Sequence, residues 1–111
     1  MDKRAFDYYI AIIEHHEKNK FCGLVGIYSE YLGDFYEITG NSQLAEEWRI
    51  KAIMNYAKDK LYRDAHRIAV KLGNDDIAFV YAKLAGIKDQ ENKSQKRNHA
   101  FRKWLDFLKN K

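Results

Sequence analysis

Apolar residues recur at intervals of three and four along most of this chain, the spacing that places side chains on one face of an α-helix. From Asn41 to Gly73 the pattern predicts two amphipathic helices joined by a polar turn at residues 58–60. Ser42 is expected to cap the first helix, because its oxygen can accept from a free amide of the first turn. The residues predicted to face inward are Ala45, Trp48, Ala52, Ile53 and Tyr56 in the first helix, and Leu61, Ala65, Ile68, Ala69 and Leu72 in the second.

The N-terminal part of the chain carries the same spacing and predicts another helical hairpin, over residues 2–33. Its second helix is expected to stop at Gly33, since glycine often follows the last turn of a helix. Gly23 and Gly26 lie three residues apart inside that helix, where glycine is unfavourable. We therefore expect a neighbouring helix to approach closely there. The segment 35–40 is predicted as a helical turn or as an extension packed beneath the next hairpin.

The C-terminal part predicts two further helices. Asn74 or Asp75 caps a fifth helix within residues 75–86, and the last helix, over residues 95–110, has an apolar face and a basic face. Proline, which helix interiors exclude, is absent from the sequence. We predict a single all-α domain over residues 1–111, in which about six antiparallel helices form stacked helical hairpins. Such a short α-solenoid would end in the basic helix.

The second hairpin matches the first when the chain is shifted by forty residues. The identical pairs fall at buried positions and at joints: Ala5 and Ala45, Ile10 and Ile50, Ile13 and Ile53, Lys18 and Lys58, Lys20 and Lys60, Leu32 and Leu72, and Gly33 and Gly73. Agreement at packing and turn positions is typical of a repeated helix–turn–helix unit. The alternative is that two antiparallel hairpins of similar length share their apolar spacing without being copies.

The hairpin over residues 41–73 resembles the tetratricopeptide family. Trp48 and Tyr56 match the aromatic residue near the start and the tyrosine near the end of that family's first helix. Tyr62 and Ala65 match the aromatic residue and the small residue of its second helix. The resemblance implies stacked helical hairpins. The closing proline of the family is missing, and the spacing of about 40 residues exceeds the family's 34, which would suit HEAT repeats better.

Positive charge is concentrated in the predicted C-terminal helix. The net charge is +4, and residues 88–111 hold eight basic and three acidic residues, so residues 1–87 sum to −1. The basic side chains could contact the phosphates of a nucleic acid, with Phe101 and Trp104 docking or stacking beside them. Alternatively, the aromatic residues face the core and the basic residues form the polar outer face that a terminal repeat needs. The basic residues concerned are Lys93, Lys96, Arg97, Arg102, Lys103 and Lys109.

Residues capable of catalysis or metal binding occur without the partners that such chemistry needs. His15 and His16 are adjacent, so on a helix they point about 100° apart and cannot share a metal ion as an i, i+4 pair can. Cys22 is the single cysteine, which rules out an intramolecular disulfide and suits a reducing compartment. The sequence holds no phosphate-binding glycine loop, zinc-type Cys/His set or dinucleotide fingerprint. We expect no catalytic activity, no metal site and no cofactor.

The sequence predicts a cytoplasmic protein that does not enter the membrane. Its first residues lack the apolar core and the small-residue cleavage site of a secretory signal. The longest apolar run is far shorter than the roughly 20 residues that cross a bilayer.

Two functional hypotheses follow from the sequence. The first is a non-catalytic interaction module that holds a peptide or helix of a protein partner on the concave face of the stack, with self-association as a homodimer also open. Its candidate contact residues are aromatic and polar side chains of the two hairpins: Tyr8, Trp48, Arg49, Tyr56, Tyr62, Arg63 and His66. The second is a small nucleic-acid-associated protein that acts through the basic C-terminal helix.

Overall fold

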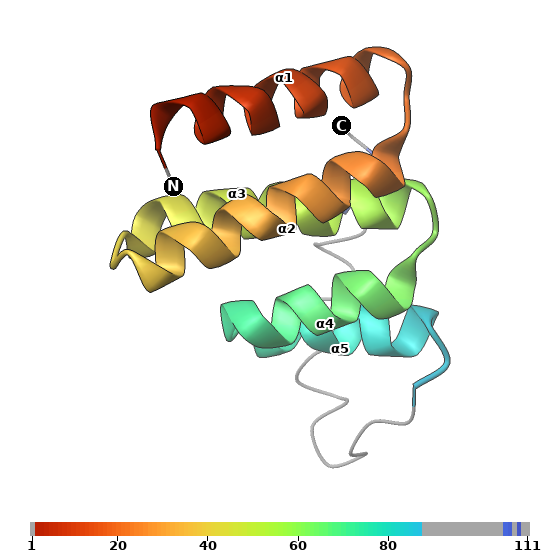
Figure 1. Cartoon of the computed structure of the whole chain (residues 1–111). Coiled ribbons are helices and arrows are strands. Elements are labelled where there is room, and N and C mark those ends of the chain that lie inside the picture. Colours follow the sequence, from red (N-terminus) through yellow and green to blue (C-terminus); the bar gives the residue numbers. More distant parts are fainter. Residues whose placement is uncertain (1, 88–105, 108, 110–111) are drawn as a thin grey trace.

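The computed structural model describes residues 2–87, 106–107 and 109, and within them the chain forms five α-helices and no strand (Figure 1). The helices are α1 (Lys3–Lys18), α2 (Cys22–Ile38), α3 (Ser42–Lys58), α4 (Tyr62–Leu72) and α5 (Asp75–Leu84). The prediction of an all-α fold is confirmed. The predicted helix over residues 95–110 lies outside the described residues, apart from Asp106, Phe107 and Lys109. None of the described helices is long and apolar enough to cross a membrane.

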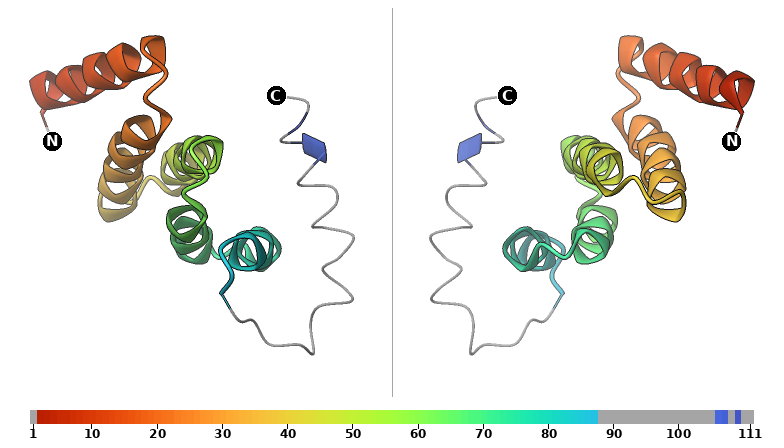
Figure 2. Two further views of the ribbon diagram at one scale, coloured as in Figure 1. Left: turned by 90° about the vertical axis from the view of Figure 1, so that its right-hand side faces the viewer. Right: turned by 90° about the vertical axis from the view of Figure 1, so that its left-hand side faces the viewer.

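The helices are arranged in three tiers. Figures 1 and 2 show α1 in a tier of its own, α2 beside α3 in the next, and α4 beside α5 in the last. Successive helices run antiparallel because their joints are short, from two to three residues. The joints before α2 and α4 lie at one end of the molecule, and those before α3 and α5 lie at the other (Figure 1).

The joints before α2 and α4 are built alike, although they lie forty residues apart. After α1 the Phe21 amide donates to the His16 carbonyl at 2.9 Å, and after α3 the Leu61 amide donates to the Tyr56 carbonyl at 2.9 Å. This bond from C″ to C3 is the mark of a Schellman motif, which needs a left-handed residue just after the helix. Lys20 (φ 60°) and Lys60 (φ 59°) fill that position, which usually holds glycine.

Gly33 does not end α2, contrary to the prediction, so the first hairpin extends past residue 33. The helix continues to Ile38, and Gly40 (φ 84°) takes the left-handed position that follows it. Gly33 is buried where α2 crosses α3, and a Cβ on it would lie 2.9 Å from Cγ of Arg49. The glycine therefore allows close packing there, while its forty-residue match, Gly73 (φ 74°), does end a helix. The ambiguous segment 35–40 is the last turn of α2 and the joint.

The close approach predicted at Gly23 and Gly26 is confirmed. A Cβ on Gly26 would lie 2.9 Å from Cδ1 of Tyr56, so α3 packs directly on the α2 backbone. Gly23, one turn earlier, faces Asp59 and Leu61 of the joint that follows α3. Glycine is therefore favoured by packing at positions where helix propensity disfavours it.

Two apolar clusters hold the tiers together. The larger lies between α3, α4 and α5, and its buried residues are Ala52, Ile53, Tyr56, Ala65, Ile68, Ala69, Ile77, Ala78 and Tyr81. The smaller lies between α1 and α2, where Ile13, Val25 and Leu32 are buried and Trp48 of α3 packs against them. Most residues predicted to face inward are indeed buried, but Leu61 is not. Ile13 is the one fully buried residue of α1, with Phe6, Tyr9 and Ile10 partly buried beside it, whereas α5 has six buried residues.

Candidate functional site

A groove lies between α2 and α4, at the end of the molecule that carries the joints before these two helices. It encloses a volume of about 820 Å³. One wall comes from the exposed side of α2, and the other comes from the start of α4 and the residues before it. A groove of this kind on a helical surface can accept an amphipathic helix or an extended peptide.

The α2 wall is an unusually apolar exposed surface. Phe21 and Tyr31 are each 52% exposed, and Leu24 and Ile27 lie between them in the lining of the groove. Their spacing of three, three and four residues places all four on one side of the helix. Leu61, 40% exposed, faces them from the joint before α4. The wall runs over eleven residues, from Phe21 to Tyr31, and is about 15 Å long at the helical rise per residue.

The floor of the groove carries a buried carboxylate. Glu30 of α2 is 8% exposed and accepts a hydrogen bond from the Tyr56 hydroxyl of α3 at 2.9 Å. Arg67 of α4 donates to both oxygens of Glu30, at 2.5 and 3.0 Å, in a bidentate pair. Lys71, one turn further along α4, donates to the same carboxylate at 3.1 Å. Glu30 therefore ties α2 to both α3 and α4.

These partners determine the protonation states of Glu30 and Tyr56 at the floor of the groove. Burial by itself raises the pKa of the Glu30 carboxyl, but the hydrogen bonds from Arg67, Tyr56 and Lys71 outweigh it and lower the pKa to about 2. Burial and the neighbouring Glu30 carboxylate raise the pKa of Tyr56 above its ordinary value. At neutral pH the carboxylate is charged and the phenol is neutral, and both are fully engaged. This chemistry stabilises the fold and offers no free acid or base.

A second carboxylate joins the two walls at the end of the groove. Oδ2 of Asp59 accepts from the Gly23 amide at 2.7 Å. Phe21, the N-cap residue of α2, has no side-chain oxygen for its own first turn, so Asp59 supplies the missing cap from thirty-six residues away. The negative charge also lies at the positively polarised end of the α2 dipole. The joint before α4 is thereby fixed against the start of α2.

Further ion pairs join α2 to α3 and α4 beyond Glu30. Arg49 of α3 is 8% exposed and pairs with Asp34 at 3.0 Å and with Glu37. Lys71 also reaches Asp34, at 3.4 Å. The acidic residues at positions 30, 34 and 37 lie along one side of α2 and meet cations from both neighbouring helices. Arg49 therefore acts in packing, with its guanidinium turned toward α2.

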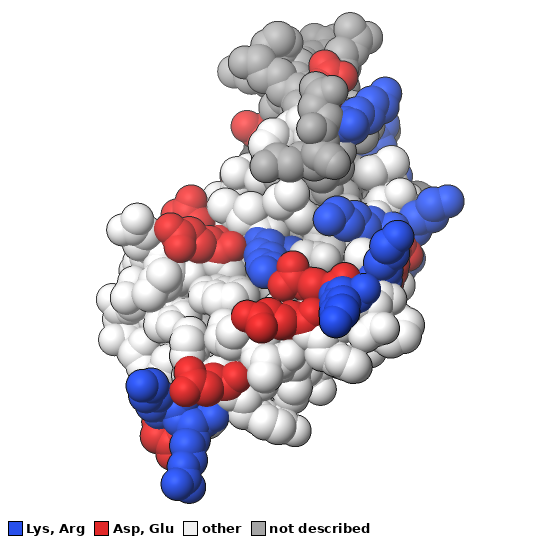
Figure 3. All heavy atoms as spheres, turned by 90° about the horizontal axis from the view of Figure 1, so that it is seen from above, with Lys and Arg blue, Asp and Glu red and all other residues white. Residues whose placement is uncertain are grey.

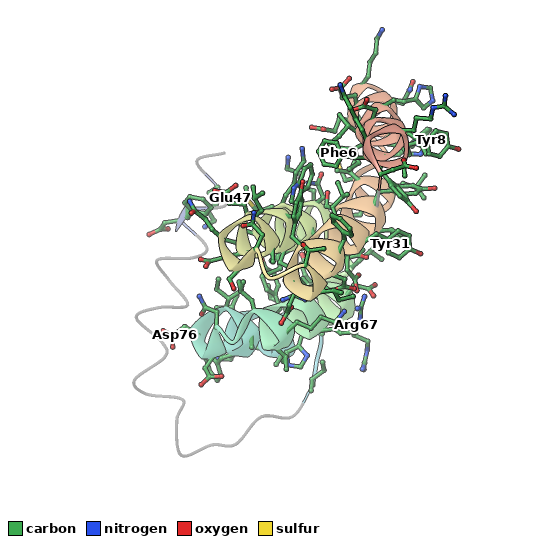
Figure 4. The ribbon with its side chains drawn as sticks, turned by 60° about the vertical axis from the view of Figure 1, so that its left-hand side comes forward. Phe6, Tyr8, Tyr31, Glu47, Arg67 and Asp76 are labelled. Atoms are coloured by element: carbon green, nitrogen blue, oxygen red, sulfur yellow. The ribbon has the colours of Figure 1, made fainter. Side chains whose placement is uncertain are left out.

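The residues expected from sequence to contact a partner do not gather on one surface. Tyr56 lines the groove, but its ring is buried and its hydroxyl is taken by Glu30. Trp48 packs on the cluster between α1 and α2, and the ring of Tyr62 stacks on that of Tyr81 with centroids 6.1 Å apart. Tyr8 is 65% exposed on α1, apart from the groove (Figure 4).

The two polar candidates on α4 also lie outside the groove lining. Arg63 is exposed, and His66 is half-buried on the same helix. Arg63 and Tyr8 are therefore separate exposed positions on two helices. A contact surface built from all seven expected residues would have to include side chains that are already used in packing.

The groove instead depends on residues outside the set of contact residues expected from sequence. These are Phe21, Leu24, Ile27, Tyr31 and Arg67. Tyr31 and Arg67 project on the same side of the molecule, from α2 and α4 (Figure 4). The available signal was that α2 carries apolar residues around more of its circumference than one buried stripe requires.

The histidine and cysteine residues considered for catalysis or metal binding lie near the joint between α1 and α2. His16 stacks on Tyr28 with ring centroids 5.9 Å apart, and it lies in the last turn of α1, where a cation is favoured. Cys22 is free and half-buried at the start of α2. Within the described residues no three His, Cys, Asp or Glu side chains lie close enough together to hold a metal ion.

Only one of the six basic residues expected to contact nucleic acid belongs to the part of the chain that the structure describes. Lys93, Lys96, Arg97, Arg102 and Lys103 lie outside the described residues, and Lys109 is described and exposed. On the face that bears α1, acidic and basic side chains are interspersed and uncharged areas lie between them (Figure 3).

No family model, no curated protein and no solved structure matches the chain. Function must therefore be argued from the groove itself.

Proposed function

We propose that this chain is a non-catalytic interaction module whose α2–α4 groove binds an amphipathic helix of a protein partner. The supporting observation is the exposed apolar wall of α2, from Phe21 to Tyr31, facing Leu61 across an open groove. Contiguous exposed apolar surface with a polar rim is typical of sites that bind another protein. Glu30 and Asp59 hold the two walls at a fixed separation, so little ordering is needed on binding.

A helix suits this groove better than an extended strand. The described part of the chain contains no sheet edge, so an extended peptide would find no ladder of backbone donors and acceptors. The α2 wall is about 15 Å long, which corresponds to roughly three turns of a partner helix. Apolar anchors at i, i+3 or i+4, and i+7 of that helix would lie against Leu24, Ile27 and Tyr31.

Peptide display tests the proposal. A library of helix-forming peptides is selected on the intact chain, and enriched peptides are measured by fluorescence anisotropy against wild type and two variants. Leu24→Glu places a charge in the wall and should weaken binding at least tenfold. Ile38→Glu alters the same helix at an 85% exposed position outside the groove lining and should bind as wild type does.

Tyr31→Ala serves as a second groove variant, because it removes an exposed ring without adding charge. Circular dichroism of each variant confirms that the helices are retained. The proposal fails if no peptide is enriched, or if enriched peptides bind Leu24→Glu and Tyr31→Ala as tightly as wild type.

The alternative function, nucleic-acid binding through residues 95–110, still rests on the sequence pattern. Its test is a salt series with the intact chain and with a form that ends at Gly86. A steep loss of affinity with salt that disappears on truncation would support it, since each neutralised phosphate releases counterions.

A further inference from the structure

We infer that the partner helix of the α2–α4 groove is acidic, and that its carboxylates meet lysines of the two joints at the end of the groove. The inference rests on the proposed function and specifies the chemistry of the partner. It depends on which charges around the groove are already paired and which are not.

The acidic groups of the groove are all engaged within the fold. Glu30 is held by Arg67, Lys71 and Tyr56. The other two carboxylates are also partnered: Asp64 pairs with Arg67 at 3.1 Å, and Asp59 caps α2 through the Gly23 amide at 2.7 Å. Glu30 and Asp64 are therefore paired with cations, whereas Asp59 accepts from a neutral amide and keeps its negative charge.

Four lysines in the joints before α2 and α4, or directly preceding those joints, have no such partners. Among the described residues, Lys18, Lys20, Lys58 and Lys60 form no ion pair, and all four are exposed. The hydrogen bond between Asp59 and Gly23 brings these two joints together. On the right in Figure 3, toward this end of the molecule, several basic side chains lie beside acidic ones.

The helix dipoles add little to this positive charge. The N-termini of α2 and α4 lie at this end of the molecule beside the C-termini of α1 and α3, so their partial charges largely cancel. Lys20 lies in the groove lining beside Phe21. The left-handed conformation of Lys20 and Lys60, set by their Schellman motifs, places both lysines at the same point of equivalent joints. An apolar wall that leads to such a cluster is complementary to a helix with apolar anchors and acidic residues.

Three versions of one designed helical peptide test the inference. They share leucines at i, i+3, i+4 and i+7 and carry glutamate, glutamine or lysine at the remaining surface positions. Binding to the intact chain is measured by anisotropy at low and at high salt. The glutamate peptide should bind at least tenfold more tightly than the lysine peptide at low salt, and the difference should shrink as salt rises.

Charge reversal identifies the groups responsible. Lys20→Glu with Lys60→Glu should abolish or reverse the preference for the glutamate peptide. Lys3→Glu with Arg4→Glu changes the same number of charges at the other end of α1 and should leave the preference intact. Equal affinity of the glutamate and glutamine peptides, or a preference that survives the Lys20/Lys60 reversal, would overturn the inference.

The outcomes separate this inference from the proposed function. If all three peptides bind equally and all are lost with Leu24→Glu, the groove binds helices but does not select acidic ones. If none of the three binds, neither proposal stands. A single-stranded RNA oligonucleotide is added as competitor, and RNA that displaces the glutamate peptide in wild type but does not bind the Lys20/Lys60 variant would identify nucleic acid as the occupant.

Discussion

Glu30 is the residue on which the geometry of the groove depends most. A buried carboxylate is costly unless cations and donors surround it, and here Arg67, Lys71 and Tyr56 meet that requirement. The three partners come from α3 and α4, while Glu30 itself lies on α2. Replacing this one side chain therefore affects how all three helices meet.

Glu30→Gln should lower the free energy of unfolding at pH 7 by about 2 kcal/mol, because it leaves two cations without their shared anion. The folded-state pKa of Glu30 is about 2, below its ordinary value of 4.5. Its contribution is therefore complete above about pH 4.5 and is lost as the pH falls toward 2. Urea unfolding of wild type and variant between pH 7 and pH 2.5 should show the difference shrinking over that range.

Tyr56→Phe provides the matched control for this pH dependence. It removes one neutral donor to Glu30 and leaves both cations in place, so it should cost about 1 kcal/mol. The loss of stability in acid should remain close to that of wild type. A constant difference between wild type and Glu30→Gln down to pH 2.5 would contradict the assignment.

Helix propensity and side-chain packing predict opposite effects of Gly26→Ala on the free energy of unfolding. Alanine is about 1 kcal/mol better than glycine inside a helix, so propensity alone predicts that Gly26→Ala stabilises the protein. The added Cβ would lie 2.9 Å from Cδ1 of Tyr56, whose ring is fixed by its hydrogen bond to Glu30. We expect a net loss of about 1 to 3 kcal/mol from overpacking. A higher melting temperature for Gly26→Ala would show that α2 and α3 are less closely packed than described.

At the scale of helices, α1 and α3 end in local backbone motifs, whereas the start of α2 is capped by a residue from a distant segment. Schellman motifs follow α1 and α3, whereas the first turn of α2 is capped by Asp59 from the joint before α4. The cap is therefore a tertiary contact, and its strength depends on how the two joints are placed.

Asp59→Ala should lower stability by about 1 kcal/mol, because the Gly23 amide loses its acceptor and the α2 dipole loses a favourable charge. Asp59→Asn keeps a side-chain oxygen and should recover most of the loss. Thermal unfolding of both variants measures the difference. Equal destabilisation by alanine and asparagine would indicate that the carboxylate charge matters more than the hydrogen bond.

The positions of the helices could be predicted from sequence much better than the end of α2. Apolar spacing and polar turns located α1, α3, α4 and α5 closely, since caps and buried faces are local properties of the chain. Gly33 and Gly73 look alike in sequence, yet one lies beneath Arg49 and the other ends α4. Whether a glycine ends a helix or allows a close crossing depends on a neighbour that local patterns do not specify.

At the scale of the whole molecule, α1 is the least firmly held tier. It has one buried residue, Ile13, and its contacts with α3 include the ion pair between Glu17 and Lys51 at 3.1 Å. In contrast, α5 buries six consecutive residues, from Ile77 to Ala82.

Native-state hydrogen exchange should therefore show α1 amides opening with a lower free energy than those of α4 and α5, because local stability follows buried contact. Exchange in α1 should be independent of low denaturant, whereas exchange in α5 should follow global unfolding. Equal protection of α1 and α5 would mean that the chain unfolds as one cooperative unit.

The candidate site was harder to predict than the fold because it depends on how the helices pack together in the whole molecule. Apolar residues of α2 could be recognised, but Phe21 and Leu24 could not be told from Val25 and Leu32 without knowing which sides the neighbouring helices cover. The buried roles of Tyr56 and Arg49 likewise follow from partners on another helix. The sequence shows that α2 carries apolar side chains. Only the packing of the neighbouring helices shows which of these side chains stay exposed.

The contact between Asp59 and Gly23 makes the groove sensitive to mechanical load. Its two walls belong to segments far apart along the chain, and this bond and the Glu30 pairs hold them side by side. A pulling force that slides α4 along α2 would load these bonds in parallel, together with the packing of α3 against both helices. A ligand bridging both walls would resist that sliding, so its occupancy would decline under tension.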